Sequence, residues 1–298
     1  MSRPSARFLA LGAVQLGLAY GVSRDSDALP DGNAILTAAE EAGIGLVDTA
    51  PHYGCSEQVI GAYLAAHPGS ALRVVSKLHP EGDVGSADAV FTQVEQSVAR
   101  IGRPLEAVLL HKCALLDRWN GPIGQGLARA RAAGLTAGLG VSVYGPDHFA
   151  LALGIADITM IQAPMNVLDR RLVAAGLLDR AAEQGVQVVL RSAFLQGLLL
   201  MEPQRLPPGM GFAVPAVSAF RQVCARWNAD PAAVALAAVR RLAPAARMVV
   251  GCHNVAQLTA NLDALDQPPP AECVAAALAL PQGDNRLVNP HLWQEPGS

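Results

Sequence analysis

Short apolar runs alternate with alanine-rich segments of helical length along almost the whole chain. We count about eight such pairs in 298 residues. Strands that alternate with helices of ten to fifteen residues indicate parallel βαβ units. Eight units in fewer than three hundred residues favour a closed barrel over an open sheet. The expected fold class is therefore α/β, as a (β/α)8 TIM barrel.

The limits of the expected strands and helices are marked by polar and glycine residues. Asp31 is placed as the N-cap of a helix that Gly43 ends, and Gly102 and Gly134 are placed as the ends of two later helices. A further helix is expected over "RRLVAAGLLDRAAEQG" and another over "DPAAVALAAVRRLA". The expected strands are "FLALGAVQLG", "IGLVDTA", "LRVVSKL", "AVLLH", "TAGLGVSV", "ITMIQAP", "VQVVLRS" and "RMVVGC".

The chain shows no convincing internal boundary, so we expect one domain over residues 1–298. Its barrel core covers about 8–265, and a proline-rich stretch leads into a C-terminal extension, 266–298, with a short helix at "VAAALAL" and a tail. Residues 201–215 predict a long loop after the seventh strand. An open dinucleotide-binding sheet is the alternative, but its glycine fingerprint fails because Val143 takes the place of the third glycine.

Composition narrows the possible partners and location. A formal net charge of -3 gives no reason to expect nucleic acid or an anionic membrane. Polar residues interrupt every apolar run well short of the ~20 residues that span a bilayer, and Gln15 and several glycines interrupt the one run that resembles a signal peptide. The five cysteines are odd in number and contain no C-x-x-C pair. We therefore expect a cytoplasmic protein without disulfides or a structural metal site.

Polar side chains stand at the ends of three successive expected strands. Asp48 ends "IGLVD", Lys77 ends "LRVVSK", His111 ends "AVLLH", and Tyr53 follows Asp48 by a few residues. Charged side chains are rarely buried without a partner. In a barrel, the carboxyl ends of the strands meet at one mouth, where active sites lie. The pattern therefore predicts that these four side chains converge there.

These residues carry a family resemblance. The stretch "DTAPHYGCSE" is similar to the aldo/keto reductase signature, and Lys77 in "VVSKL", His111 in "LLHK" and Gln162 in "IQAPMNVLDRR" follow in the order that the family shows. The resemblance covers essentially 8–265. It implies an NAD(P)H-dependent oxidoreductase that interconverts a carbonyl and an alcohol, without a metal. "RSAFLQGLLL" and "NPHLW" resemble bacterial members associated with sugar or polysaccharide metabolism.

The resemblance also implies a role for each of the four residues. Tyr53 matches the general acid, whose phenol must donate a proton to a developing alkoxide. A lysine ammonium near the phenol favours phenolate character, and Asp48 would keep Lys77 charged and oriented. His111 would hydrogen-bond the substrate carbonyl.

The cofactor implied by the resemblance is NADPH/NADP+, with NADH possible. Val143 stands where the family has an asparagine, Arg191 where it has a stacking aromatic residue, and His253 where many members have an arginine for the 2′-phosphate. Backbone N–H groups and a serine hydroxyl after the seventh strand are suited to phosphate. The expected cofactor-binding residues are Ser142, Gln162, Arg191, Ser192, Phe194, Gln196, Gly197, Gly251, His253, Asn254, Gln257 and Asn261.

The substrate side is less specified. His52, within the signature, is a candidate for the pocket wall or for shaping its loop, and Trp119 for the pocket wall or for anchoring its loop. The expected substrate is a small carbonyl compound or sugar, and the expected state a monomer or small homo-oligomer. Two other functions remain open: a cofactor-binding regulatory or partner subunit with little turnover, and a lyase or isomerase on the same barrel.

Overall fold

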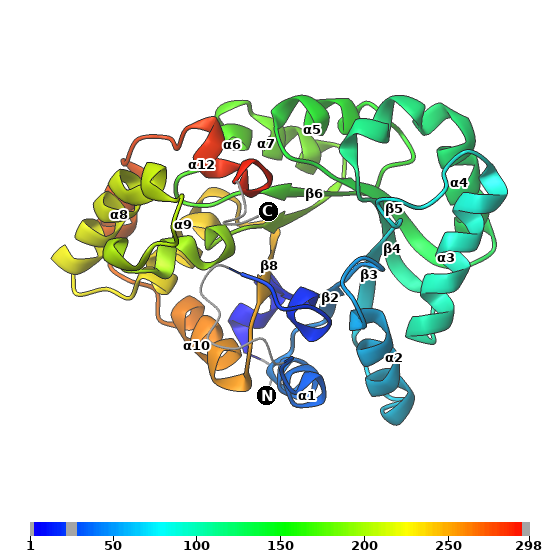
Figure 1. Ribbon diagram of the computed structural model, residues 1–298, viewed down its shortest axis with the longest axis horizontal. Coiled ribbons are helices and arrows are strands. Elements are labelled where there is room, and N and C mark those ends of the chain that lie inside the picture. Colours follow the sequence, from blue (N-terminus) through cyan, green and yellow to red (C-terminus); the bar gives the residue numbers. More distant parts are fainter. Residues whose placement is uncertain (1–2, 22–28, 294–298) are drawn as a thin grey trace.

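The structure is a computed structural model that describes residues 3–21 and 29–293, and its centre is a closed parallel barrel (Figure 1). Each strand pairs with the next in the chain, and the first pairs with the last, which confirms the expected (β/α)8 fold. The strands are β1 Leu9–Gly12, β2 Leu46–Asp48, β3 Arg73–Lys77, β4 Leu105–Leu110, β5 Thr136–Ser142, β6 Met160–Pro164, β7 Gln187–Arg191 and β8 Arg247–Gly251.

The barrel encloses a small apolar core that is separate from the packing outside it. Successive side chains of a strand point to opposite faces, so in β4 Ala107 and Leu109 belong to the enclosed cluster, whereas Val108 and Leu110 belong to the cluster under the helices. A Cβ on Gly140 of β5 would lie 2.0 Å from the Met160 carbonyl oxygen. The close approach of β5 and β6 therefore requires glycine there.

Helices between the strands, together with one helix after the last strand, form the outer ring. They are α1 Gly32–Ala42, α2 Ser56–Ala66, α3 Ala87–Ile101, α4 Gly124–Ala132, α5 Pro146–Leu153, α6 Arg171–Ala174, α7 Leu177–Glu183, α8 Val214–Arg226, α9 Pro231–Leu242 and α10 Val255–Asp266. The predicted caps of α1 are confirmed: the Ala34 N–H donates to Asp31 Oδ1 at 3.0 Å, and Gly43 is left-handed. Gly102 and Gly134 have φ values of 81° and 74° after α3 and α4.

Three segments differ from the expectation. The first strand ends at Gly12, because the chain then turns into a short 3-10 helix, Val14–Leu16. The expected helix after β6 is split into α6 and α7 at Gly176, whose φ of 62° no continuous helix allows. The expected loop 201–215 contains the 3-10 turns Pro203–Arg205 and Gly211–Ala213, and it leads into α8, which the sequence analysis did not identify.

The C-terminal segment packs onto one side of the barrel. It forms α11 Ala271–Leu278, α12 Asn285–Val288 and a 3-10 turn, Pro290–Leu292, while residues 294–298 of the expected tail lie outside the described residues. Cys273 and Leu287 share a buried apolar cluster with Phe220 of α8. In Figure 1 the red α12 lies beside α6, where Gln282 donates to the Leu168 carbonyl at 2.7 Å. Within the described ranges, no helix is long and apolar enough to cross a membrane.

Candidate active site

Lys77 and Asp48 form a buried ion pair at the carboxyl ends of neighbouring strands. Lys77 Nζ donates to Asp48 Oδ1 at 2.7 Å and to the Thr49 carbonyl at 2.9 Å, and the Lys77 side chain is only 1% exposed. Across the barrel, Gln162 Nε2 donates to the same carboxylate oxygen at 2.7 Å. A buried charge needs a partner and further hydrogen bonds. These contacts supply both, so Lys77 and Asp48 are held in one arrangement.

Tyr53 lies on the loop between β2 and α2, above this pair. The Lys77 ammonium nitrogen is 5.1 Å from the centre of the Tyr53 ring. The loop is supported from below by Gly17, where a Cβ would lie 1.9 Å from the Tyr53 carbonyl oxygen. Gly54 follows with a φ of 56°, a left-handed value that suits glycine. The loop can take this course only because Gly17 lets the two backbones approach closely and Gly54 adopts the left-handed conformation.

His111 completes the group one residue beyond β4. Its ring meets the Tyr53 ring edge-on, with the two centres 6.1 Å apart. Burial and the nearby Lys77 ammonium lower the pKa of His111 to about 3, so its imidazole is neutral at pH 7. The Nδ1 atom is buried and has no hydrogen-bond partner among the described residues.

Electrostatics keep the phenol protonated and the amine charged. Burial raises the pKa of Tyr53 above its ordinary value of 10, and the Lys77 ammonium offsets only part of the rise. Burial alone would lower the pKa of Lys77, but Asp48 and Tyr53 raise it above 10.5. The sequence analysis expected Lys77 to favour the phenolate, whereas in this structure the burial of Tyr53 outweighs that effect. At neutral pH the site therefore presents an O–H donor.

A cavity of about 580 Å³ opens above Asp48, Tyr53 and His111 and extends to α10. Lys77 lies behind Asp48 and does not line it. The expected cofactor-binding residues that do line it are Ser142, Gln162, Arg191, Ser192, Phe194, Gln196, Gly197, Gly251, His253, Gln257 and Asn261. The barrel thus brings residues from β2 through α10 to one space.

The middle of the cavity wall comes from β5, β6 and β7. Ser142 Oγ donates to Gln162 Oε1 at 3.0 Å, so this serine orients the amide that bonds Asp48. Arg191 Nη2 donates to the Val143 carbonyl at 3.0 Å, and the guanidinium lies 4.7 Å from the centre of the Tyr144 ring. None of the carboxylates in the described ranges forms an ion pair with Arg191. The cavity therefore holds a fixed, unpaired cation.

The loop after β7 has an unusual backbone. Ser192, Leu195 and Gln196 have φ values of 65°, 48° and 56°, in the left-handed region that non-glycine residues seldom adopt. Gly197 follows at 94°. The N–H groups of Ala193 and Phe194 donate to no other group in the described part of the chain. Such a turn offers backbone donors to an anion.

The start of α10 forms the far end of the cavity. Asn254 Oδ1 accepts from the Gln257 N–H, and Gln257 Oε1 accepts from the His253 N–H, both at 2.8 Å. These two bonds cap the helix. The side-chain oxygens expected to face a ligand are therefore occupied by backbone donors, and Asn254 does not line the cavity. His253 and the buried Asn261 do.

The two residues expected in the substrate pocket lie elsewhere. Trp119 is 3% exposed within the apolar core beside α4, which matches the alternative role of anchoring its loop. His52 is exposed and does not line the cavity; its ring lies between His111 and His79, with centres 6.4 Å and 5.4 Å away. The structure does not bring either side chain to the cavity above Tyr53.

Several lining residues were missed by the sequence analysis. Tyr20, Tyr144 and Asp230 line the cavity, and Gln15 packs so closely that a Cβ on Gly251 would lie 2.3 Å from its Oε1 atom. Gln15 interrupts an otherwise apolar stretch, which is a signal the sequence offered. Tyr20 and Asp230 carried no such signal, because they lie outside the strand ends and reach the cavity only through the fold.

The geometry as a whole defines a barrel with a protonated tyrosine at its mouth, close to a buried ammonium. Among the described residues, no group of three or more His, Cys, Asp or Glu is arranged to hold a metal ion. The neutral imidazole and the phenol face the same space, so both can contact one oxygen atom of a ligand. Such an arrangement can hydrogen-bond an oxygen atom and exchange a proton with it.

Known proteins share this fold and sequence pattern. The family model for the aldo/keto reductase family matches residues 8–279. The chain is 28% identical to a D-threo-aldose 1-dehydrogenase from a Pseudomonas species over 328 aligned positions, which cover 96% of this chain and 92% of the relative. Because the family model covers nearly the whole chain, this protein belongs to the aldo/keto reductase family, whose members are oxidoreductases that bind nicotinamide cofactors.

Solved structures agree on the fold. The holo form of the aldo-keto reductase AKR11C1 from Bacillus halodurans superposes with a TM-score of 0.72 at 21% identity, over 97% of this chain and 94% of that one. The glycerol dehydrogenase AKR11B4 from Gluconobacter oxydans gives a TM-score of 0.69 at 22% identity, over 90% and 89% of the two chains. At these identities the likeness concerns the fold alone.

Proposed function

We propose that this protein is an NAD(P)H-dependent oxidoreductase that reduces an aldehyde or ketone, or oxidises the corresponding alcohol or aldose, with Tyr53 as the general acid and base. The observation that carries the proposal is the buried Lys77–Asp48 pair, whose ammonium nitrogen is 5.1 Å from the centre of the Tyr53 ring, at the base of a cavity lined also by His111. A buried ammonium under a tyrosine stabilises the charge that the phenol acquires when it gives up its proton.

Reduction needs a proton at the oxygen atom that becomes an alcohol. A nicotinamide supplies or accepts the hydride when it is bound. Tyr53 donates its phenolic proton to the substrate oxygen, and Lys77 stabilises the resulting phenolate. Asp48 keeps Lys77 in place, and Gln162 in turn holds Asp48. His111, neutral at physiological pH, donates a hydrogen bond to the same oxygen and orients the carbonyl toward Tyr53.

The raised pKa of Tyr53 gives the two directions different pH requirements. Reduction uses the protonated phenol, which is the form present throughout the neutral range. Oxidation uses the phenolate, so it gains as the pH approaches the pKa of Tyr53 from below. On this basis we expect oxidation to be fastest at alkaline pH and reduction to lose rate there.

The residues along the cavity fit a dinucleotide. The space is about 580 Å³, its middle carries the left-handed turn at Ser192–Gly197 with free N–H groups, and Gly12 and Gly251 line its floor. The turn would hold the pyrophosphate, and Gln162 with Ser142 would lie near the carboxamide. Asn261 and the amide nitrogen of Gln257, whose oxygen accepts from the His253 N–H, would face the adenine. We favour NADPH as the cofactor because of the family resemblance and the backbone donors at the start of α10. NADH is a second possibility, because the half-buried His253 lacks the permanent charge of an arginine.

The substrate class follows from the relatives' names and the polar wall. One relative is a D-threo-aldose 1-dehydrogenase, and one structural neighbour is a glycerol dehydrogenase. A small sugar or polyol carries hydroxyl groups that suit Tyr20, Tyr144 and Arg191 in the cavity.

The five cysteines are free, with four of them buried, which supports a location in the reducing cytoplasm.

The first experiment is a fluorescence titration of the purified protein with NADPH and, in parallel, with NADH. Saturable binding that is tighter for NADPH supports the proposal and its cofactor preference. Equal binding of the two makes the enzyme dual-specific. If neither binds, the tyrosine has no hydride source, and the oxidoreductase proposal is wrong.

A further inference from the structure

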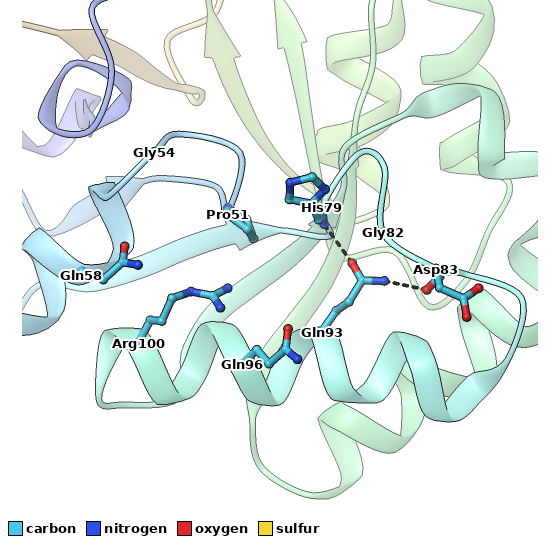
Figure 2. A pocket seen from close by; sticks show the side chains of 9 residues that line it. All are labelled: Pro51, Gly54, Gln58, His79, Gly82, Asp83, Gln93, Gln96 and Arg100. Carbon is cyan, nitrogen blue, oxygen red and sulfur yellow. Dashed lines mark hydrogen bonds between the residues drawn. The ribbon is translucent and has the colours of Figure 1, made fainter.

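A second pocket, of about 410 Å³, lies on the outside of the barrel between α2 and α3 (Figure 2). It shares no lining residue with the cavity above Tyr53. Its walls come from the β2–α2 loop, the β3–α3 loop and the facing sides of the two helices. The lining residues are Pro51, Gly54, Gln58, His79, Gly82, Asp83, Gln93, Gln96 and Arg100. Six of these nine residues have polar side chains, which distinguishes this pocket from a gap between apolar helix faces.

One wall is built by specific hydrogen bonds. Gln93 Oε1 accepts from the His79 N–H at 3.0 Å, and Gln93 Nε2 donates to the Asp83 carbonyl at 2.7 Å, as the dashed lines in Figure 2 show. A Cβ on Gly82 would lie 2.4 Å from the same Oε1 atom. The glycine lets the amide reach both ends of the loop, so contacts within the protein hold this wall in place.

The charge of Arg100 is balanced behind the pocket. Arg100 Nε donates to Glu57 Oε2 at 2.6 Å, and the other oxygen of this buried carboxylate accepts from Ser76 Oγ at 2.5 Å. The pair is therefore neutral overall, and the exposed Asp83 adds negative charge nearby. An anionic ligand would gain little here.

Several hydrogen-bonding groups of the pocket are left without partners. Gln58 and Gln96 are exposed, and within the described chain their amides bond no other residue; Arg100 Nη1 is also unpartnered. An amide presents both a donor and an acceptor. A hydroxyl group also donates and accepts, so a molecule with several hydroxyls matches this mixture better than a carboxylate, phosphate or amine does.

We propose that the pocket between α2 and α3 binds a neutral polyhydroxylated molecule, a sugar or polyol, through Gln58, Gln96 and Arg100. Such a ligand would contact Pro51 and Gly54, which lie on either side of His52 and Tyr53 in the same loop. His79 in the pocket also touches His52, whose ring reaches His111. Occupancy would therefore act on the loop that carries Tyr53, from the side opposite the active-site cavity.

The test reads binding directly and needs no cofactor or turnover, so it is independent of the proposed oxidoreductase function. Cofactor-free protein is titrated with sorbitol while the Cε1–H signals of the seven histidines are followed by proton NMR. The His79 signal is assigned with His79→Gln. We expect a saturable shift of this signal. The double substitution Gln58→Leu, Gln96→Leu should weaken the apparent affinity about tenfold or more, because two sets of hydrogen bonds are lost.

Controls separate this pocket from the rest of the molecule. Gln184→Leu changes an exposed glutamine at the end of α7 and should leave the titration unchanged. Tyr53→Phe should also leave it unchanged, since Tyr53 does not line this pocket.

A second titration with maltitol identifies the source of the ligand. Equal affinity indicates a free small polyol, and tighter binding of maltitol indicates one unit of a longer saccharide.

Two results would overturn the proposal. One is the absence of a saturable His79 shift in the wild-type protein at sorbitol concentrations far above the ~1 mM scale of weak binding. The other is a shift that persists unchanged in the double variant, because the polyol would then bind elsewhere. Circular dichroism of the double variant checks its fold; both glutamines are exposed and unbonded, so we expect no change there.

Discussion

The two halves of the barrel mouth are built in different ways. In the first half, at β2 to β4, side chains make direct bonds deep inside the protein: Lys77 is 1% exposed and Asp48 is 5% exposed, and the two form an ion pair. In the second half, beyond the buried Ser142 and Gln162, the cavity is lined by half-buried side chains and by a loop whose backbone is left-handed at Ser192 and Gln196. The first half holds ionisable side chains in fixed positions, whereas the second half forms most of the cavity wall and supplies backbone N–H donors.

This difference suggests how each half responds to substitution. A buried ion pair does not tolerate the loss of one member, because the other is left as an unpaired charge. A half-buried guanidinium or imidazole can be replaced with smaller consequences. We therefore expect large effects on rate and stability from the first half, and smaller effects on cofactor selectivity from the second.

The largest effect is expected for Tyr53→Phe. Removing the phenolic O–H should lower kcat by a factor of about 10²–10⁴, the usual contribution of a general acid. Binding of NADPH, followed by fluorescence, should change little, because the ring remains. Unchanged turnover of aldehydes in this variant would contradict the assigned role of Tyr53.

Lys77→Met should destabilise the protein as well as inactivate it. Asp48 would keep its bond from Gln162 but lose its charged partner, so the free energy of unfolding should fall by about 3–5 kcal/mol, measured by urea denaturation. The double variant Lys77→Met, Asp48→Asn should recover much of this loss without recovering activity. Lys112→Met, at an exposed lysine, is the matched control. A similar loss of unfolding free energy in both lysine variants would show that the buried ion pair does not contribute more to stability than an exposed lysine does.

His111 should make stability depend on pH. Its folded-state pKa is about 3, against 6.5 for an unperturbed histidine. Between these values the unfolded chain binds the extra proton, so the free energy of unfolding should fall as the pH falls from 6.5 toward 3, by at most about 1.4 kcal/mol per pH unit. Urea denaturation of the wild-type protein and of His111→Gln compares the slopes. Equal slopes would mean that His111 is not buried as a neutral imidazole.

In the second half, His253→Arg should increase the preference for NADPH over NADH. If this position faces the 2′-phosphate, a guanidinium adds a charge-assisted bond, and the ratio of the two dissociation constants should rise about 5- to 20-fold. The fluorescence titrations measure it. A ratio that stays constant would place His253 away from the phosphate.

The smallest effect is expected for Arg191→Leu. The fixed cation in the cavity disfavours an oxidised, positively charged nicotinamide. Its removal should tighten NADP+ relative to NADPH by about two- to fivefold, because the site is partly solvent-screened. Calorimetric titration with each form gives the ratio, and no change would indicate that Arg191 faces the substrate rather than the nicotinamide.

Much of the site could be predicted from sequence because its groups stand at strand ends. Asp48, Lys77 and His111 each follow an apolar run, and a parallel barrel brings all such positions to one mouth. Trp119 and His52 stand in loops rather than at strand ends, and no periodicity in the sequence reveals the course of these loops. Gly176 was visible in the sequence, but its left-handed conformation, which splits the helix after β6, was not.

The alternation of strands and helices, together with the polar residues at the strand ends, was enough to determine the barrel and the neighbourhood of Asp48, Tyr53, Lys77 and His111. The pKa of Tyr53 was decided only by tertiary structure, because burial depends on what packs around the phenol and outweighs Lys77. The pocket between α2 and α3 was also decided only by tertiary structure. Its residues follow no regular spacing along the chain, and only the packing of two helices and two loops brings their unpaired amides around one space.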